Sequence, residues 1–150
     1  IVAEGLLSAL GIGFAEELVF RGWLLDELQR DYNDRVSLWA NSLVFALSHF
    51  IKPVAVMLRS WPQFPGLLLL GLILVGGKRS RQNRLGLPIG FHTGIVWGYY
   101  IINVGELVRY SGSVPDWVTG VNGNPLAGAI GLLFLGALAF AMRNSTDFRF

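Results

Sequence analysis

The sequence predicts an all-α fold, a polytopic bundle of about five transmembrane helices with one of them short or re-entrant. Three observations lead to this prediction. Hydrophobic residues make up 53% of the 150-residue chain, charged residues only 15%, and the mean hydropathy is +0.51. The apolar residues gather in segments, most of them long enough for a helix to cross the bilayer core. Short polar loops, which hold most of the basic residues, separate these segments.

The apolar segments follow one another along the chain, and their approximate ranges are 5–25, 37–58, 65–77, 86–108 and 126–142. The third segment is the short one, so it spans part of a bilayer or lies re-entrant. None of the polar stretches between the segments is long enough to link two domains, and we expect one domain over residues 1–150. Because the chain opens at Ile1 inside an apolar stretch, we expect the native chain to extend further upstream.

The basic residues predict the sidedness of the bundle. If the five segments alternate in direction, one face receives Arg30, Arg35, Lys78, Arg79, Arg81, Arg84, Arg143 and Arg149. Arg59 and Arg109 fall on the other face, so the first face is expected to be cytoplasmic. Topology thus explains the net charge of +2, and no nucleic-acid partner is expected. We expect an integral, multi-pass protein of a bacterial inner membrane or an organelle membrane, in contact with membrane lipids.

A row of small residues opens the first segment. Gly5, Ala9 and Gly13 recur at four-residue spacing, which places them on one helical face. In lipid, such a row lets a neighbouring backbone come close, because packing rather than water exclusion drives helix association. We therefore expect another helix to pack against this row.

Three ionisable residues end the same segment. Each costs about 2.5–3.5 kcal/mol to insert into a bilayer, so each needs a compensating interaction or a function. Glu17 and Arg21 stand four apart on one face, where they can pair and offset each other's desolvation. Glu16 is turned about 100° away and is left to face a cavity as a candidate general base. A purely structural ionic network is the alternative for all three residues.

The chain has two histidines, and both lie inside apolar segments. Shortly after His49, the pair Lys52 and Pro53 indicates a helix end or a kink. Pro88 suits the start of a helix and places His92 just over one turn into it. Taken singly, a membrane histidine is often only hydrogen-bonded to a carbonyl or to a neighbouring helix. Together with the glutamates, the two histidines predict one hydrolytic centre built from three helices.

Other catalytic chemistries have weak support in the sequence. Cysteine is absent, which excludes a thiolate nucleophile and a thiolate metal site. Ser48 adjoins His49 but would point about 100° away from it on a helix, and neither a GxSxG elbow nor an HExxH zinc motif occurs. Two histidines and a glutamate are ligand types that zinc accepts. The cofactor therefore stays open between none and a divalent metal such as zinc.

The order of these motifs resembles that of the CPBP intramembrane proteases, a family named for CAAX proteases and bacteriocin-processing enzymes and also called the Abi family. The family motifs EExxxR and FxxxH are matched, in chain order, by Glu16, Glu17, Arg21, Phe45 and His49. The third motif, HxxxN, is matched only by its histidine, His92. Each motif is short, but their order on successive apolar helices makes the combination specific. The resemblance covers nearly the whole chain.

The resemblance implies an intramembrane endopeptidase that cuts a peptide bond of a membrane-associated protein or peptide. Glu16 would activate the attacking water with help from His49, and His92 would hold the tetrahedral oxyanion. Glu17 and Arg21 would be supporting residues that position the first helix. The prenyl-protein substrate of the founding members is not carried over, because none of these residues recognises a lipidated C-terminus.

The sequence departs from the family pattern four residues after His92. The family has asparagine there, whereas this chain has Val96, which offers no hydrogen-bond donor. One oxyanion donor is typically worth about 2.7–4 kcal/mol. Asn103 shares a helical face with His92 but lies about 16 Å away along the axis. The other candidates for a replacement donor are Thr93, Asn41 and Asn122.

Three functions stay open at this point. The matched motifs favour the endopeptidase. Val96 favours a catalytically weak or inactive family member that acts as a membrane binding or scaffold protein. A proton-coupled carrier is the third, since chains of glutamate and histidine also relay protons. The lack of an internal repeat counts against the carrier.

Overall fold

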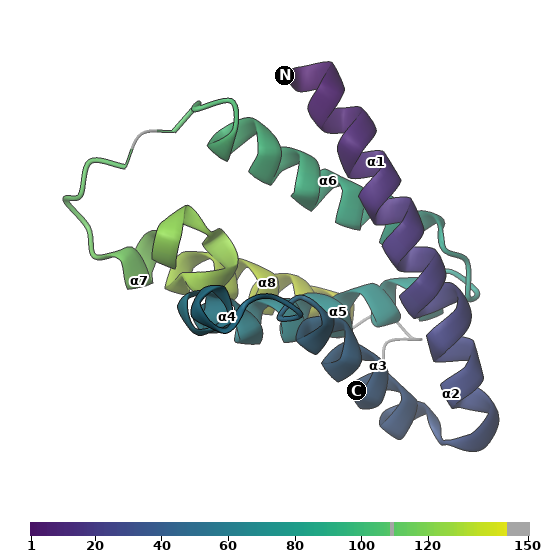
Figure 1. Ribbon diagram of the computed structural model, residues 1–150. Helices are drawn as coiled ribbons and strands as arrows, with labels where there is room; N and C mark the ends of the chain where they lie inside the picture. Colours follow the sequence, from purple (N-terminus) through teal and green to yellow (C-terminus); the bar gives the residue numbers. More distant parts are fainter. Residues whose placement is uncertain (109, 144–150) are drawn as a thin grey trace.

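The structure of the protein is a computed structural model that describes residues 1–108 and 110–143 (Figure 1). This part of the chain is all-α, as predicted, and contains no strand. Its helices are α1 (Val2–Glu17), the π-helical segment η1 (Leu18–Leu24), α2 (Leu25–Asp31), α3 (Asp34–Ser48), α4 (Val54–Ser60), α5 (Phe64–Arg79), α6 (Gly86–Asn103), α7 (Asp116–Thr119) and α8 (Ala129–Arg143). Short 3-10 turns are η2 (Trp61–Gln63), η3 (Val121–Gly123) and η4 (Pro125–Ala127).

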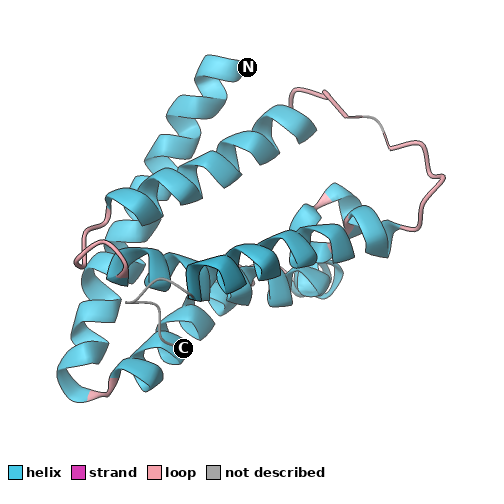
Figure 2. Ribbon diagram, turned by 180° about the vertical axis from the view of Figure 1, so that it is seen from behind, coloured by secondary structure: helices cyan, strands magenta, loops and turns pink. Residues whose placement is uncertain are grey.

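The helices form two layers that meet at an angle (Figures 1 and 2). Helices α1 and α6 lie side by side in one layer, and α3, α4, α5 and α8 make up the other. Helix α5 is central, because it packs against α3, α6 and α8 and so joins the layers. Its buried side chains supply much of the core, namely Leu67, Leu70, Leu72, Ile73, Leu74 and Val75.

The first predicted segment, 5–25, is part of a longer continuous helix. The backbone stays helical through both junctions of α1, η1 and α2, with φ −63° and ψ −43° at Leu18 and at Leu25. The helix ends only at Tyr32, which is extended with φ −126° and ψ 154°. Apolarity stops at Asp26, but good helix formers follow it, so the hydrophobic pattern alone placed the end too early.

The second predicted segment, 37–58, is not one helix. Helix α3 ends at Ser48, and a turn separates it from α4. Pro53 has no N–H group and disfavours a helical conformation of the residue before it, so the indicated break at Lys52 and Pro53 is confirmed. His49 therefore caps the end of α3, with φ −68° and ψ −11°, instead of lying within a span.

One helical stretch in the described part of the chain is long and apolar enough to cross a membrane. It comprises α4, η2 and α5, runs from Val54 to Arg79 and has 26 residues. The segment 65–77, expected to be the short one, thus belongs to the longest apolar helix. Pro62 hid this continuity, because a proline in the first turn of a helix breaks no hydrogen bond. Helix α8 is apolar but shorter.

The basic residues of the predicted cytoplasmic face gather at one end of the molecule. The α2–α3 and α5–α6 connections lie at this end, whereas α4 and the loop before α7 lie at the other (Figure 1). An ion pair of 3.6 Å between Arg79 and Asp34 joins the two connections. Arg109 and Arg149 lie outside the described residues, as does the side chain of Arg143.

The small-residue row of α1 packs against α6, as predicted. Ala9 is fully buried. A Cβ atom on Gly5 would lie 2.4 Å from the ring of Tyr100, and one on Gly13 would lie 2.5 Å from Thr93 Oγ1 and 3.0 Å from its backbone nitrogen. Glycine at these two positions therefore permits an approach that no other residue would.

We predict that Gly13→Ala lowers the free energy of unfolding by about 1–3 kcal/mol, because the added methyl group forces α1 and α6 apart. The matched control is Gly11→Ala on the same helix, where a Cβ atom meets nothing within 4 Å. Thermal unfolding of both variants in detergent micelles measures the difference. Equal stability of the two variants would contradict the close contact.

Candidate active site

The ion pair predicted between Glu17 and Arg21 is present and fully buried. Arg21 Nη1 donates to Glu17 Oε1 at 2.9 Å, and both side chains have 0% exposure. A buried pair of this kind is retained only when further partners satisfy the charges. Arg21 has two, since Nη2 donates to the carbonyl of Gly71 at 3.4 Å and the guanidinium lies 4.1 Å from the ring centre of Phe45.

His92 makes a second contact with Glu17. Its Nδ1 lies 2.8 Å from Glu17 Oε1, the same oxygen that accepts from Arg21. Because a carboxylate paired with an arginine can only accept, Nδ1 carries the proton and Nε2 is left for other partners. The His92 side chain is only 4% exposed. The expected role of Glu17 was to position the first helix. It also bonds an imidazole of α6.

His49 is held by the last turn of α3. Its Nδ1 lies 2.8 Å from the carbonyl oxygen of Phe45 and therefore donates to it, which leaves Nε2 for other partners. Ser48 Oγ donates to the same carbonyl at 2.7 Å and lies 3.5 Å from His49 Nδ1. The two side chains thus share one acceptor, the carbonyl of Phe45. The Ser48 proton is bonded to that carbonyl, so no serine–histidine nucleophile pair forms.

Glu16 lies between the two imidazoles. Its Oε2 is 3.8 Å from His49 Nε2 and 3.9 Å from His92 Nε2. The side chains of Glu16 and His49 are partly accessible, with exposures of 31% and 28%, whereas His92 is buried. Three residues from α1, the end of α3 and α6 therefore surround one point, with free carboxylate and imidazole atoms directed at it.

A family comparison bears on this arrangement. The profile described as type II CAAX prenyl endopeptidase Rce1-like matches residues 1–98. The chain belongs to this family. The match includes every motif residue from Glu16 to His92 and ends within α6. Comparisons with curated proteins and with solved structures gave no match. The resemblance to CAAX proteases is thereby confirmed for the Rce1-like family, whose members are embedded in membranes.

A cavity of about 490 Å³ opens beside the two histidines of this Rce1-like chain. The rest of its wall is mostly apolar and comes from α5, α6 and α8, through Leu67, Leu70, Ile95, Ile102, Phe134 and Leu135. Asn103 and Asn124 also line it, and Asn103 stands eleven residues, or about 16 Å, along α6 from His92. The volume and the apolar wall with few polar groups are typical of a ligand site.

Val96 lies in the wall of the same cavity. Methyl groups therefore face the space where the motif HxxxN would place an amide. Two of the expected replacements are committed elsewhere. Asn41 Nδ2 donates to the carbonyl of Phe20 at 2.6 Å, and the exposed Asn122 is directed at the carbonyl of Arg59 at 3.5 Å.

The remaining two candidates lie nearer to the cavity but make other contacts. Thr93 Oγ1 is buried without a hydrogen-bond partner among the described residues, and it packs against Gly13 of α1. Asn103 does line the cavity, and its Nδ2 donates to the carbonyl of Tyr99 at 3.1 Å. Neither residue places a donor where Val96 stands.

Glu16, His49 and His92 do not form a closed zinc site in this arrangement. In the part of the chain that the structure describes, no group of three or more His, Cys, Asp or Glu residues is placed to hold a metal ion. The separations of 3.8 and 3.9 Å from Glu16 to the histidines exceed the roughly 3.3 Å expected between two ligands of one tetrahedral zinc ion.

Lys78 makes contacts with the first long helix that the sequence did not predict. Lys78 belongs to the basic stretch assigned to the predicted cytoplasmic face, and its side chain is only 3% exposed. Its Nζ donates to the carbonyl of Arg21 at 2.6 Å and pairs with Asp26. The end of α5 is thus tied to the π-helical segment that carries Arg21. No local pattern connects residues that stand 57 positions apart.

We predict that Lys78→Met lowers the free energy of unfolding by about 1–3 kcal/mol, because a buried carbonyl loses its extra donor and Asp26 loses its partner. Arg84→Met, at an exposed position in the following loop, is the control and is expected to change stability by less than about 0.5 kcal/mol. Chemical or thermal unfolding in micelles measures both. If Lys78→Met is as stable as the control, the contacts of Lys78 with Arg21 and Asp26 contribute nothing to the free energy of unfolding.

Proposed function

We propose that this chain is an intramembrane endopeptidase that hydrolyses a peptide bond with a water activated by Glu16. One observation carries the proposal: Glu16 Oε2 stands within 4 Å of the Nε2 atoms of both His49 and His92. These separations are too long for direct hydrogen bonds and short enough for one water molecule to reach all three atoms. Membership in a family of CAAX prenyl endopeptidases supports the reaction class.

In the proposed reaction, Glu16 takes a proton from the water as its oxygen attacks the scissile carbonyl carbon. His49 assists, because its Nδ1–H is bonded to the Phe45 carbonyl and its Nε2 lone pair accepts a second hydrogen bond from the water. When the carbon–nitrogen bond breaks, the proton held by Glu16 passes to the leaving amine. The hydroxyl group of the water thus becomes part of the new carboxyl end, and its other hydrogen becomes part of the new amino end.

His92 is the proposed donor to the oxyanion of the tetrahedral intermediate. With Nδ1–H bonded to Glu17, a proton on Nε2 makes an imidazolium whose charge the Glu17 carboxylate balances. Arg21 in turn pairs with that carboxylate at 2.9 Å. Glu17 and Arg21 are thereby supporting residues that act through His92.

The proposed setting is a polytopic bundle of about five helices, one domain over residues 1–150, in a bacterial inner membrane or an organelle membrane. Large apolar side chains on outward surfaces support lipid contact, among them Leu7, Ile51, Leu58 and Leu133 with exposures of 72%, 86%, 67% and 73%. A water-soluble protein rarely exposes contiguous apolar surface on this scale. The basic residues at one end support the predicted orientation.

The proposed substrate is a membrane-associated protein or peptide that enters the cavity beside the histidines. Its apolar wall favours hydrophobic side chains, and the amides of Asn103 and Asn124 offer hydrogen bonds to a peptide backbone. The family description supports a peptide substrate.

We predict that Glu16→Gln reduces kcat/KM by about 10²–10⁴-fold, because the amide keeps the shape of the side chain but cannot accept the proton. Cleavage of fluorogenic peptides by the purified protein in detergent measures the loss. Glu4→Gln is the control, since Glu4 lies on the same helix at 78% exposure, and it should cleave like the parent. Undiminished cleavage by Glu16→Gln would remove the proposed base.

A noncatalytic family member that binds partners in the membrane is the second candidate, and Val96 is the observation that favours it. We predict that Val96→Asn raises the cleavage rate by about 10²–10³-fold, because it returns an oxyanion donor to the cavity wall. Val96→Leu adds no donor and should add no activity. An inert parent made active by Val96→Asn identifies a degenerate enzyme, whereas an already active parent rejects the binding-only function.

A further inference from the structure

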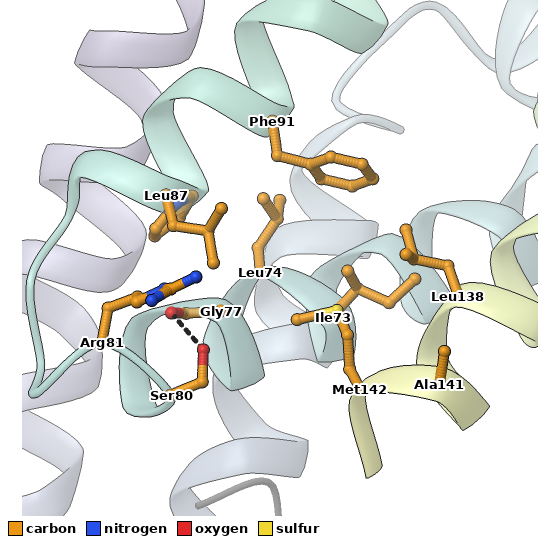
Figure 3. Close-up of a pocket in the computed structure, with 11 residues that line it drawn as sticks. Ile73, Leu74, Gly77, Ser80, Arg81, Leu87, Phe91, Leu138, Ala141 and Met142 are labelled. Atoms are coloured by element: carbon orange, nitrogen blue, oxygen red, sulfur yellow. Dashed lines mark hydrogen bonds between the residues drawn. The ribbon is translucent and has the colours of Figure 1, made fainter. Parts of the chain in front are cut away.

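A second cavity, of about 530 Å³, lies between α5, α6 and α8 near the α5–α6 connection (Figure 3). Most of its wall is apolar and includes Ile73, Leu74, Leu87, Phe91, Leu138 and Ala141. It shares no lining residue with the cavity beside the histidines. The proposed peptidase chemistry therefore makes no use of it.

Two polar side chains belong to this apolar wall, those of Ser80 and Arg81. Ser80 Oγ donates its proton to the carbonyl of Gly77 at 3.1 Å (Figure 3). Arg81 is exposed and lies at the edge of the cavity, with its guanidinium directed toward the space between Leu87 and Gly77 (Figure 3). The cavity is thus an apolar chamber with a cation at its opening.

Arg81 differs from the basic residues just before it. Lys78 is paired with Asp26, and Arg79 with Asp34. Arg81 has no carboxylate within ion-pair distance in the described part of the chain. Its charge is therefore available to an external anion.

The position of the cavity in the bundle indicates which class of anion it can bind. It opens at the end of the bundle where the predicted cytoplasmic residues gather, at the level where lipid headgroups lie in the proposed orientation. Basic pockets between membrane helices on this side bind anionic lipid headgroups. A ligand that fills an apolar chamber and also meets a cation at its mouth must be an amphiphile with a negative head.

We infer that this cavity binds one acyl chain of an anionic phospholipid, with the headgroup phosphate against Arg81. Burial of the acyl chain is common to all phospholipids, so the chamber supplies affinity without headgroup preference. Arg81 supplies the preference, because the ammonium of a zwitterionic headgroup offsets the attraction of its phosphate. The inference requires the proposed membrane setting but no catalytic activity.

The test measures lipid binding to the purified protein by native mass spectrometry, with phosphatidylglycerol and phosphatidylcholine titrated separately. The parent is expected to bind the anionic lipid about fivefold more tightly. Arg81→Gln should abolish this preference, and Arg84→Gln, an exposed residue of the same loop that does not line the cavity, should retain it. Ala141→Trp fills the chamber and should weaken both lipids.

Several results would overturn the inference. Equal binding of the two lipids by the parent would remove the headgroup preference, and a preference unchanged in Arg81→Gln would remove the proposed cation. Competition by free glycerol phosphate as strong as that by the lipid would show that no acyl chain is bound. If Ala141→Trp fails to fold, Arg81→Gln and Arg84→Gln still test whether Arg81 sets the headgroup preference. Because the readout is lipid binding, these results leave the peptidase proposal to its own experiments.

Discussion

One buried oxygen, Glu17 Oε1, accepts hydrogen bonds from Arg21 at 2.9 Å and from His92 at 2.8 Å. Since both donors and the carboxylate are removed from solvent, loss of any one of them leaves an uncompensated charge or polar group in a medium that cannot solvate it. Arg21 reaches onward to α3 and α5 through Phe45 and Gly71. Four helices are therefore held in register by interactions that start at one carboxylate.

The arrangement around that carboxylate separates rigid from accessible parts of the centre. Glu17 and His92 are buried, and the close packing of α1 on α6 at Gly13 restricts movement between the two helices. Glu16 and His49 lie next to them and are partly exposed, and both histidines line the cavity. Under the proposed function, the buried half would hold the oxyanion donor in place while the accessible half handles water and the exchange of protons.

The features of the site that depend on local sequence spacing could be predicted. Those that depend on tertiary contacts could not. The pairing of Glu17 with Arg21 follows from the helical repeat alone, and the packing of the small-residue row follows from the absence of side chains. The contact of His92 with Glu17 could not be derived, because it depends on the relative heights of α1 and α6. Apolarity likewise located the segments but not their ends, since charged helix formers extend α2 and a proline in the first turn leaves α5 joined to α4.

The mostly apolar wall of the cavity beside the histidines includes His92 and Asn103, which stand about 16 Å apart along α6. An extended polypeptide advances about 3.3 Å per residue. A chain anchored by the amides of Asn103 and Asn124 would therefore present to Glu16 the bond about five residues away from the anchor. Under the proposed function, the length of α6 between His92 and Asn103 would fix the distance from the anchor to the cleaved bond. Selectivity would then rest on that distance more than on the identity of any single side chain.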